Sequence, residues 1–221
     1  VVDAFNVACC NVQLECVSAL APIVRQMSDC HGVVSNALRL TATGTPGRED
    51  YSLDAERCQI AKQLLQMKAD VDHPNRFGTT AVTRAVESGF CDILQLLIDA
   101  KANIHAAAGN GWNPVVACAF KGNAMAMQMV LAAKANVDHT YSGGTSATSL
   151  AAEKHYCDVL KLLIENRADV DLALKSGATP LYQAVEKQRA ETIEMLLAAK
   201  ASTNLMRNTD HWTPIFVADR K

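Results

Sequence analysis

The sequence predicts an all-α solenoid made of helix-turn-helix units joined by β-turn loops, with a helical cap at its N-terminal end. Three observations predict it. A glycine recurs at a constant interval, a helix-capping residue type follows each glycine by two positions, and an apolar stripe recurs in the second half of each unit. One such unit cannot bury its own apolar stripe, whereas stacked units bury one another's.

The start of a helix recurs in every unit. The repeated glycines are Gly78, Gly111, Gly144 and Gly177. Two positions later stand Thr80, Asn113, Ser146 and Thr179. These residue types accept a hydrogen bond from a free backbone N–H at a helix start. The next residue is alanine or proline, and proline suits the first helical position, which has no N–H bond to lose. A fifth copy, Thr213-Pro214, comes one position later than the constant interval predicts.

A second helix follows in each unit. Apolar residues at 93, 94, 97 and 98 have the spacing of one buried helical face. The same phase holds Leu97, Val130, Leu163 and Leu196. An alanine then leads into the extended segments Asn103-Ile104, Asn136-Val137, Asp169-Val170 and Ser202-Thr203. Each unit therefore consists of a turn, a short helix, a tight connection, a second helix and an extended loop.

These residues match a known family. Gly177-Ala178-Thr179-Pro180-Leu181, followed by two helices and a loop of the Ala-Asp-Val-Asp type, closely resembles the ankyrin repeat. The resemblance covers about residues 52–221. It divides the chain into a non-repeat N-terminal part, 1–50, and a repeat array, 51–221. The array has a partial repeat at each end and four full repeats, at about 78–104, 111–137, 144–170 and 177–203.

The chain departs from the family pattern before each loop alanine, where glycine is usual. The residues at this position are Lys68, Lys101, Lys134, Arg167 and Lys200. Without glycine we expect the easy left-handed end of the helix to be lost. A cation near the last carbonyls offsets about 0.3–1 kcal/mol of that loss. We expect the five cations to form a row along one edge, and we favour this compensation over a role in binding an anionic partner.

The two ends of the chain lie outside the complete repeats. Helical spacing predicts one helix within Val7–Met27 and a short one within Gly32–Leu40, followed by a loop at 41–47. We interpret residues 1–50 as a cap over the first repeat, with a docking arm for a larger assembly as the alternative. The fifth copy contains only one helix. We therefore expect either that the natural chain continues past Lys221 or that a partner covers this end.

Composition excludes several classes of protein. With 221 residues, a formal net charge of −2 and 49% hydrophobic residues, the chain has enough apolar material for a continuous core. It lacks the concentrated basic charge of a general nucleic-acid binder, and no segment is apolar enough to span a membrane. The eight cysteines lack the spacing of a disulfide framework. We expect reduced thiols and a cytoplasmic, intracellular location, with an organelle interior after import as the alternative.

The cysteines and histidines do not predict a catalytic or metal site. Cys58, Cys91 and Cys157 share a repeat phase with Ala124 and Ala190, and Cys118 shares another phase with alanines. We interpret both of these repeat positions as buried slots for a small apolar residue. His155 and Cys157, two residues apart, do not share a helix face. A metal at Cys9, Cys10, Cys16, Cys30 and His31 is a weak hypothesis, because no zinc-like pair occurs there. We expect no enzyme activity, no cofactor and no small-molecule substrate.

The resemblance implies a protein that binds another protein or protein complex through its concave face. In such proteins the turn tips and the first helices contact the partner. By position these residues are Arg76, Phe77, Asn110, Trp112, Phe120, Lys121, Tyr141, Glu153, Lys154, Lys175, Glu186, Lys187 and Trp212. We expect Trp112 and Tyr141 to be exposed and to have no folding role, although each tryptophan could instead lie along the neighbouring turn. The alternative function is a structural accessory or linker subunit held permanently in a larger, organellar membrane-associated complex.

Overall fold

The structure, a computed structural model, describes residues 1–27, 29–43, 54–209 and 211–219. It divides into two compact units, Val1–Gly109 and Asn110–Lys221. The predicted boundary at residue 50 and most of the predicted loop at 41–47 lie outside the described residues. Among the described residues, no helix has both the length and the apolar character that crossing a bilayer requires.

The first unit is helical. Its helices are α1 (Val2–Cys10), α2 (Leu14–Arg25), α3 (Cys30–Thr41), α4 (Asp54–Gln66), α5 (Ala81–Ser88) and α6 (Cys91–Asp99). The single helix expected within Val7–Met27 is wrong, because the chain breaks it between α1 and α2. Val12 there is buried and has a positive φ of 57°, which ends the helical hydrogen-bond pattern.

The N-terminal helices of this unit pack against its repeat helices. α3 contacts both α4 and α5, and α1 contacts α3. The hydroxyl of Ser35 accepts a hydrogen bond from the backbone N–H of Asp70 at 2.7 Å, which ties α3 to the loop after α4. The buried guanidinium of Arg57 lies 4.7 Å from the ring centroid of Phe90 and donates to the carbonyl of Thr41.

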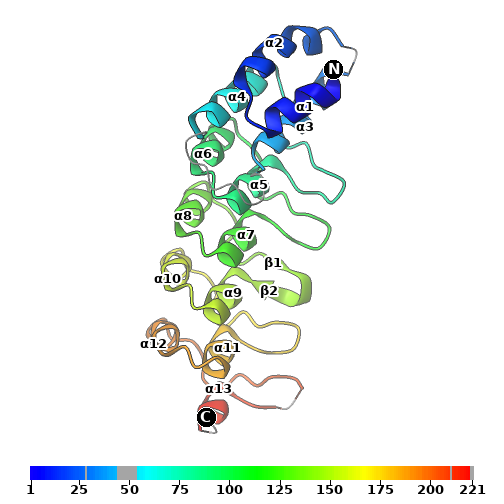
Figure 1. Ribbon diagram of the computed structural model, residues 1–221. Helices are drawn as coiled ribbons and strands as arrows, with labels where there is room; N and C mark the ends of the chain where they lie inside the picture. The colour runs from blue at the N-terminus through cyan, green and yellow to red at the C-terminus, as the bar shows by residue number, and fades with distance from the viewer. Residues whose placement is uncertain (28, 44–53, 210, 220–221) are drawn as a thin grey trace. The chain divides into compact units, whose positions relative to one another are not determined.

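The second unit contains successive helix pairs. Its elements are α7 (Pro114–Lys121), α8 (Ala124–Ala132), β1 (Thr140–Tyr141), the 3-10 turn η2 (Ser142–Gly144), β2 (Thr145–Ser146), α9 (Ala147–Lys154), α10 (Cys157–Glu165), α11 (Pro180–Glu186), α12 (Ala190–Ala198) and α13 (Pro214–Asp219). First helices α7, α9 and α11 pack side by side, as do second helices α8, α10 and α12 (Figure 1). β1 and β2 pair in an antiparallel hairpin, with Tyr141 opposite Thr145.

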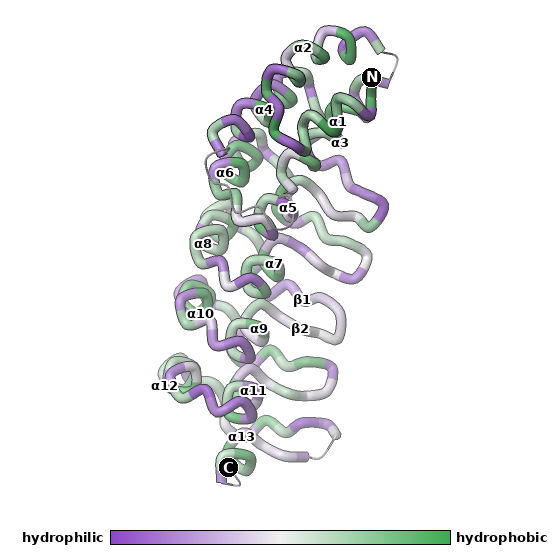
Figure 2. The backbone as a smooth tube through the Cα atoms, viewed as in Figure 1, coloured by the Kyte–Doolittle hydropathy of each residue, from purple (hydrophilic) through white to green (hydrophobic). Residues whose placement is uncertain are grey.

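Within the repeats the core lies between first and second helices. The predicted second-helix positions Leu97, Val130, Leu163 and Leu196 are completely buried. α7 and α8 are hydrophobic along most of their length (Figure 2). The alternation of these helices with polar connecting segments is the pattern that stacked repeats require.

The predicted caps explain where the first helices begin. The side chains of Asn113, Ser146, Thr179 and Thr213 each accept a hydrogen bond from the backbone N–H three residues later, at 2.9–3.3 Å. Thr80 differs. Its hydroxyl is buried and makes no cap bond, and it has no hydrogen-bond partner among the described residues. The prediction that every copy opens its helix in the same way is therefore wrong at Thr80.

Replacing Thr179 and Thr80 by alanine distinguishes a cap residue that makes a hydrogen bond from one that makes none. Thr179→Ala should lower the free energy of unfolding by about 1 kcal/mol, because it leaves the N–H of Tyr182 without its acceptor. Thr80→Ala should cost less than half as much, since no cap bond is lost. Urea denaturation of both variants measures the difference, and equal losses would mean that Thr80 also caps its helix.

The second helices end in a left-handed residue even though that residue is a cation. The φ angles of Lys68, Lys101, Lys134, Arg167 and Lys200 lie between 61° and 69°, and all five side chains are exposed. The expectation that this ending is lost without glycine is therefore wrong. The N–H of Lys101 donates to Ile98 and that of Ala102 donates to Leu97, and the other four helices repeat this pair of bonds. These two bonds satisfy the last carbonyls and outweigh the strain of the left-handed cation.

Aspartates in the loops join successive repeats. Asp72 Oδ1 accepts a hydrogen bond from the N–H of Asn103 at 2.7 Å. In the second unit, Asp138 and Asp171 accept from the N–H groups of Asp169 and Ser202, each at 2.8 Å. All three bonds have the same separation along the chain. The loop aspartate therefore bonds to the repeat after its own, which explains why the loop prefers this residue type.

Candidate functional site

The predicted binding residues divide between the two units. Arg76 and Phe77 lie in the first unit, where the guanidinium of Arg76 lies 4.6 Å from the ring centroid of Phe77. Phe77 is 62% exposed. The other eleven predicted residues lie in the second unit. Of these, Asn110, Phe120, Lys121, Lys175 and Lys187 are exposed, and the rest are half-buried.

The second unit brings four of the predicted residues together in what we call the aromatic cluster: Trp112, Phe120, Tyr141 and Lys154. The ring of Trp112 lies edge-on to the rings of Phe120 and Tyr141, each with a centroid separation of 5.4 Å. The ammonium of Lys154 lies 4.5 Å from the centroid of Phe120. The cluster therefore joins two successive repeats through their loops and first helices.

Hydrogen bonds to backbone carbonyls hold the loops of the aromatic cluster in place. The N–H of Ser142 donates to the carbonyl of Asn110 at 3.0 Å. The Nε2 atom of His139 lies 2.8 Å from the carbonyl oxygen of Gly111. These bonds help to hold Tyr141 beside Trp112.

The expectation that Trp112 and Tyr141 are exposed and have no folding role is wrong. Both are half-buried, because each lies against its neighbours in the aromatic cluster. Phe120 keeps 40% of its surface exposed and offers the larger apolar contact. Edge-on aromatic pairs contribute about 0.5–1.5 kcal/mol beyond the area they bury. Trp112 and Tyr141 therefore support the surface on which Phe120 lies.

A second group of aromatic residues lies near α13. Trp212 and Phe216 are edge-on at 5.3 Å, and the guanidinium of Arg207 lies 4.8 Å from the ring centroid of Tyr182. Arg207 also pairs with Glu186 at 3.6 Å. Glu186 is therefore a predicted binding residue that already has a partner within the chain.

The repeat phase predicts that four cysteines are buried, and the structure confirms this for only one of them. Cys118, in the middle of α7, is fully buried, whereas Cys58, Cys91 and Cys157 are half-buried. The prediction is wrong for these three. Cys91 and Cys157 are the first residues of α6 and α10, where a helix has not yet entered the packed core. Burial is the largest cause that raises the pKa of Cys58, Cys91 and Cys157.

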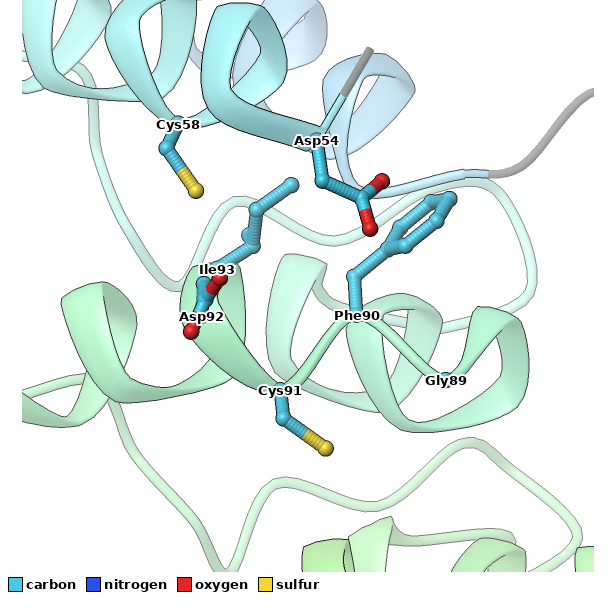
Figure 3. A pocket seen from close by; sticks show the side chains of 7 residues that line it. All are labelled: Asp54, Cys58, Gly89, Phe90, Cys91, Asp92 and Ile93. Atoms are coloured by element: carbon cyan, nitrogen blue, oxygen red, sulfur yellow. The ribbon is translucent and has the colours of Figure 1, made fainter. Parts of the chain in front are cut away.

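A small pocket lies between α4 and α6 in the first unit. Figure 3 shows Asp54, Phe90 and Ile93 around it, with Cys58 pointing toward α6 and Cys91 pointing away from Cys58. Its volume is about 160 Å³, below the roughly 300–1,000 Å³ that is typical of small-molecule sites.

Thiol labelling should follow burial. Burial raises the pKa of Cys9 to about 12, an effect that the hydrogen bond from Thr41 opposes and the neighbouring Cys10 reinforces. At pH 8 only about 10⁻⁴ of this thiol is then the reactive thiolate. We expect iodoacetamide to modify the exposed Cys16 first and Cys9 and Cys118 last, as mapped by mass spectrometry of peptides. Early labelling of Cys9 or Cys118 in the folded protein would contradict these assignments.

The structure also brings His155 and Cys157 together, although their spacing along the sequence does not place them on one helix face. His155 ends α9 in a left-handed conformation, so the chain reverses before Cys157 begins α10. As a result, the Nδ1 atom of His155 lies 3.5 Å from the Cys157 sulfur. Sequence spacing alone could not reveal this contact, because it depends on the turn between the helices.

Comparison with known proteins identifies the family. The family model for ankyrin repeats, in three copies, matches residues 52–141 and 148–220. No curated protein matches the chain. Apart from the first residue of α9, the matched segments include the helices from α5 to α12, and the all-α architecture agrees with an ankyrin solenoid. Ankyrin repeats are generally protein–protein interaction modules. The chain belongs to the ankyrin-repeat family.

Proposed function

We propose that this protein is a non-enzymatic binding module that recognises another protein through its loop tips and first helices, with the aromatic cluster at the centre of the contact. The observation that carries the proposal is the aromatic cluster itself. Aromatic residues make up only 5% of the chain, yet three of them meet at one place. Aromatic side chains are the commonest anchors of protein interfaces.

The charges and the exposed apolar area around Phe120 also support the aromatic cluster as the binding surface. Lys154 lies over one face of Phe120, so a cation borders the exposed apolar area. Lys121, next to Phe120 at the end of α7, adds an exposed positive charge. A partner with an apolar side chain flanked by carboxylates fits this arrangement, because it fills the apolar area and pairs with the bordering cations.

The test uses Phe120 rather than Trp112 or Tyr141, because the latter two support the fold. Affinity-tagged full-length chain is crosslinked in native extract, and each captured protein is quantified by mass spectrometry. Phe120→Ala should lower the yield of the specific partner by about tenfold or more. Phe77→Ala tests the exposed loop tip of the first unit.

Met125→Ala is the matched control. Met125 is 62% exposed, so its substitution removes comparable apolar surface, but it lies on the second helix α8. Capture should be unchanged in this variant. Full capture by Phe120→Ala would contradict the proposal and place the contact elsewhere.

The alternative, a structural accessory subunit, is favoured by exposed apolar residues outside the aromatic cluster. Ile215 and Phe216 on α13 are 61% and 39% exposed. Apolar surface of this kind is typical of permanent interfaces. Sedimentation of the isolated chain distinguishes the two functions, because a module should remain monomeric and an isolated subunit should aggregate.

A further inference from the structure

Three side chains with different ligand chemistry converge in the second unit. A ring nitrogen of His155, the sulfur of Cys157 and a carboxylate oxygen of Glu191 all lie within 4.8 Å of one another. The Nδ1 atom of His155 is 3.5 Å from the Cys157 sulfur, and its Nε2 atom is 3.8 Å from Glu191. Among the described residues, no other group of three such side chains meets in this way.

Repeat stacking produces this convergence. His155 and Cys157 flank the turn between α9 and α10, whereas Glu191 lies in the first turn of α12 in the next repeat. α10 packs against α12, which brings the starts of the two helices together. The three side chains therefore belong to two repeats and lie across the junction between them.

The other repeats do not carry this combination. The position of His155 is occupied elsewhere by Gly89, Gly122 and Gln188. The position of Glu191 is occupied by Asp92, Met125 and Asp158. The two glycines have φ angles of 77° and 69°, and His155 has a φ of 60° in the same left-handed region. A side chain at this position bears a backbone strain that glycine avoids.

Thr192 orients the imidazole. Its side chain is completely buried, and its hydroxyl lies 2.8 Å from Nδ1 of His155 and 3.9 Å from the Cys157 sulfur. The equivalent residues are apolar in the other second helices, namely Ile93, Ala126 and Val159. This contact occupies Nδ1 and leaves Nε2 as the atom that faces the ion, and a contact at the other ring nitrogen is what fixes the orientation of a metal-binding histidine.

We propose that His155, Cys157 and Glu191 bind a zinc ion whose fourth ligand is water. Imidazole, thiolate and carboxylate are the three side-chain ligands that zinc uses in proteins. In a tetrahedral site these ligand atoms are separated by about 3.4–3.6 Å. In this structure one ligand atom of each residue lies within 4.8 Å of the others, which is wider than this separation, and Glu191 is exposed and able to move the remaining distance. A bound ion would join two successive repeats at their second helices.

Zinc displaces the thiol proton directly, so binding should release one proton from Cys157 to the buffer.

The experiment titrates the full-length reduced chain with Co²⁺, which reports a thiolate ligand by its charge-transfer absorption, and then displaces it with Zn²⁺. The wild-type protein should develop this absorption, release a proton, and show a higher Tm with zinc, since the ion binds only the folded state. His155→Gly and Cys157→Ala should abolish the absorption and the Tm shift. Both replacements occur naturally at the same position in other repeats, so these variants should fold.

Two further variants complete the test. Thr192→Val keeps the side-chain volume and should weaken zinc binding by about 10–100-fold while the cobalt absorption remains. Cys91→Ala is the matched control, because Cys91 begins α6 in the same repeat phase but Gly89 replaces the histidine. It should bind as tightly as the wild type. A cobalt–thiolate absorption that survives Cys157→Ala at full affinity, or disappears in Cys91→Ala, would overturn the proposal, as would absence of the absorption in the wild type.

Discussion

Leu163→Ala should lower the free energy of unfolding by about 2–5 kcal/mol. Leu163 is completely buried in α10, which packs against α8, α9 and α12. Truncation removes apolar contacts and leaves a cavity that the neighbouring helices fill only in part. Urea denaturation followed by circular dichroism measures the loss.

Lys161→Ala provides the control in the same helix. Lys161 is exposed, so its substitution should change stability by no more than about 0.5 kcal/mol. Equal stability of Leu163→Ala and the wild type would show that the register of α10 is wrong.

Gly177→Ala should cost about 2–4 kcal/mol, because it combines backbone strain with a steric clash. Gly177 has a φ of 83°, and a Cβ atom there would lie 2.7 Å from the backbone nitrogen of Asn208. That nitrogen donates a hydrogen bond to the carbonyl of Ser176, so it cannot move away without losing the bond.

Gly89→Ala separates the two causes. Gly89 has a similar φ of 77°, but nothing lies within 4 Å of the added Cβ atom. It should therefore show only the conformational cost, about 1 kcal/mol. Thermal unfolding of both variants gives the difference, and an equal loss in each would exclude the clash as the cause at Gly177.

Periodic features were predictable from the sequence because each one recurs. Four of the five cap positions accept the expected hydrogen bond, and the predicted second-helix positions Leu97, Val130, Leu163 and Leu196 are buried as expected. A local signal repeated several times selects one architecture even where a single copy is weak. Thr80 shows the limit, since its residue type fits the pattern and its hydroxyl still makes no cap bond.

The candidate sites were less predictable, because they depend on contacts between repeats. Trp112 and Tyr141 belong to different repeats, and only the packing of two loops shows that they shield each other. The contact of His155 with Cys157 depends on a left-handed turn at a residue that is not glycine. Glu191 belongs to the repeat after that of Cys157, and repeat stacking alone brings it near. The spacing of residues along the sequence does not show that these side chains lie close together.

The loop aspartates affect what happens when a whole repeat is deleted from the chain or duplicated in it. Asp138 accepts from the N–H of Asp169, and Asp171 accepts from that of Ser202, so the repeat that contains Asp169 and Asp171 carries both a donor and an acceptor. Loss of one whole period, 139–171, would join Asp138 to Leu172 and set it opposite the N–H of Ser202, which restores the same bond. Deletion or duplication of this repeat can therefore change the length of the protein by one repeat without creating a new kind of junction.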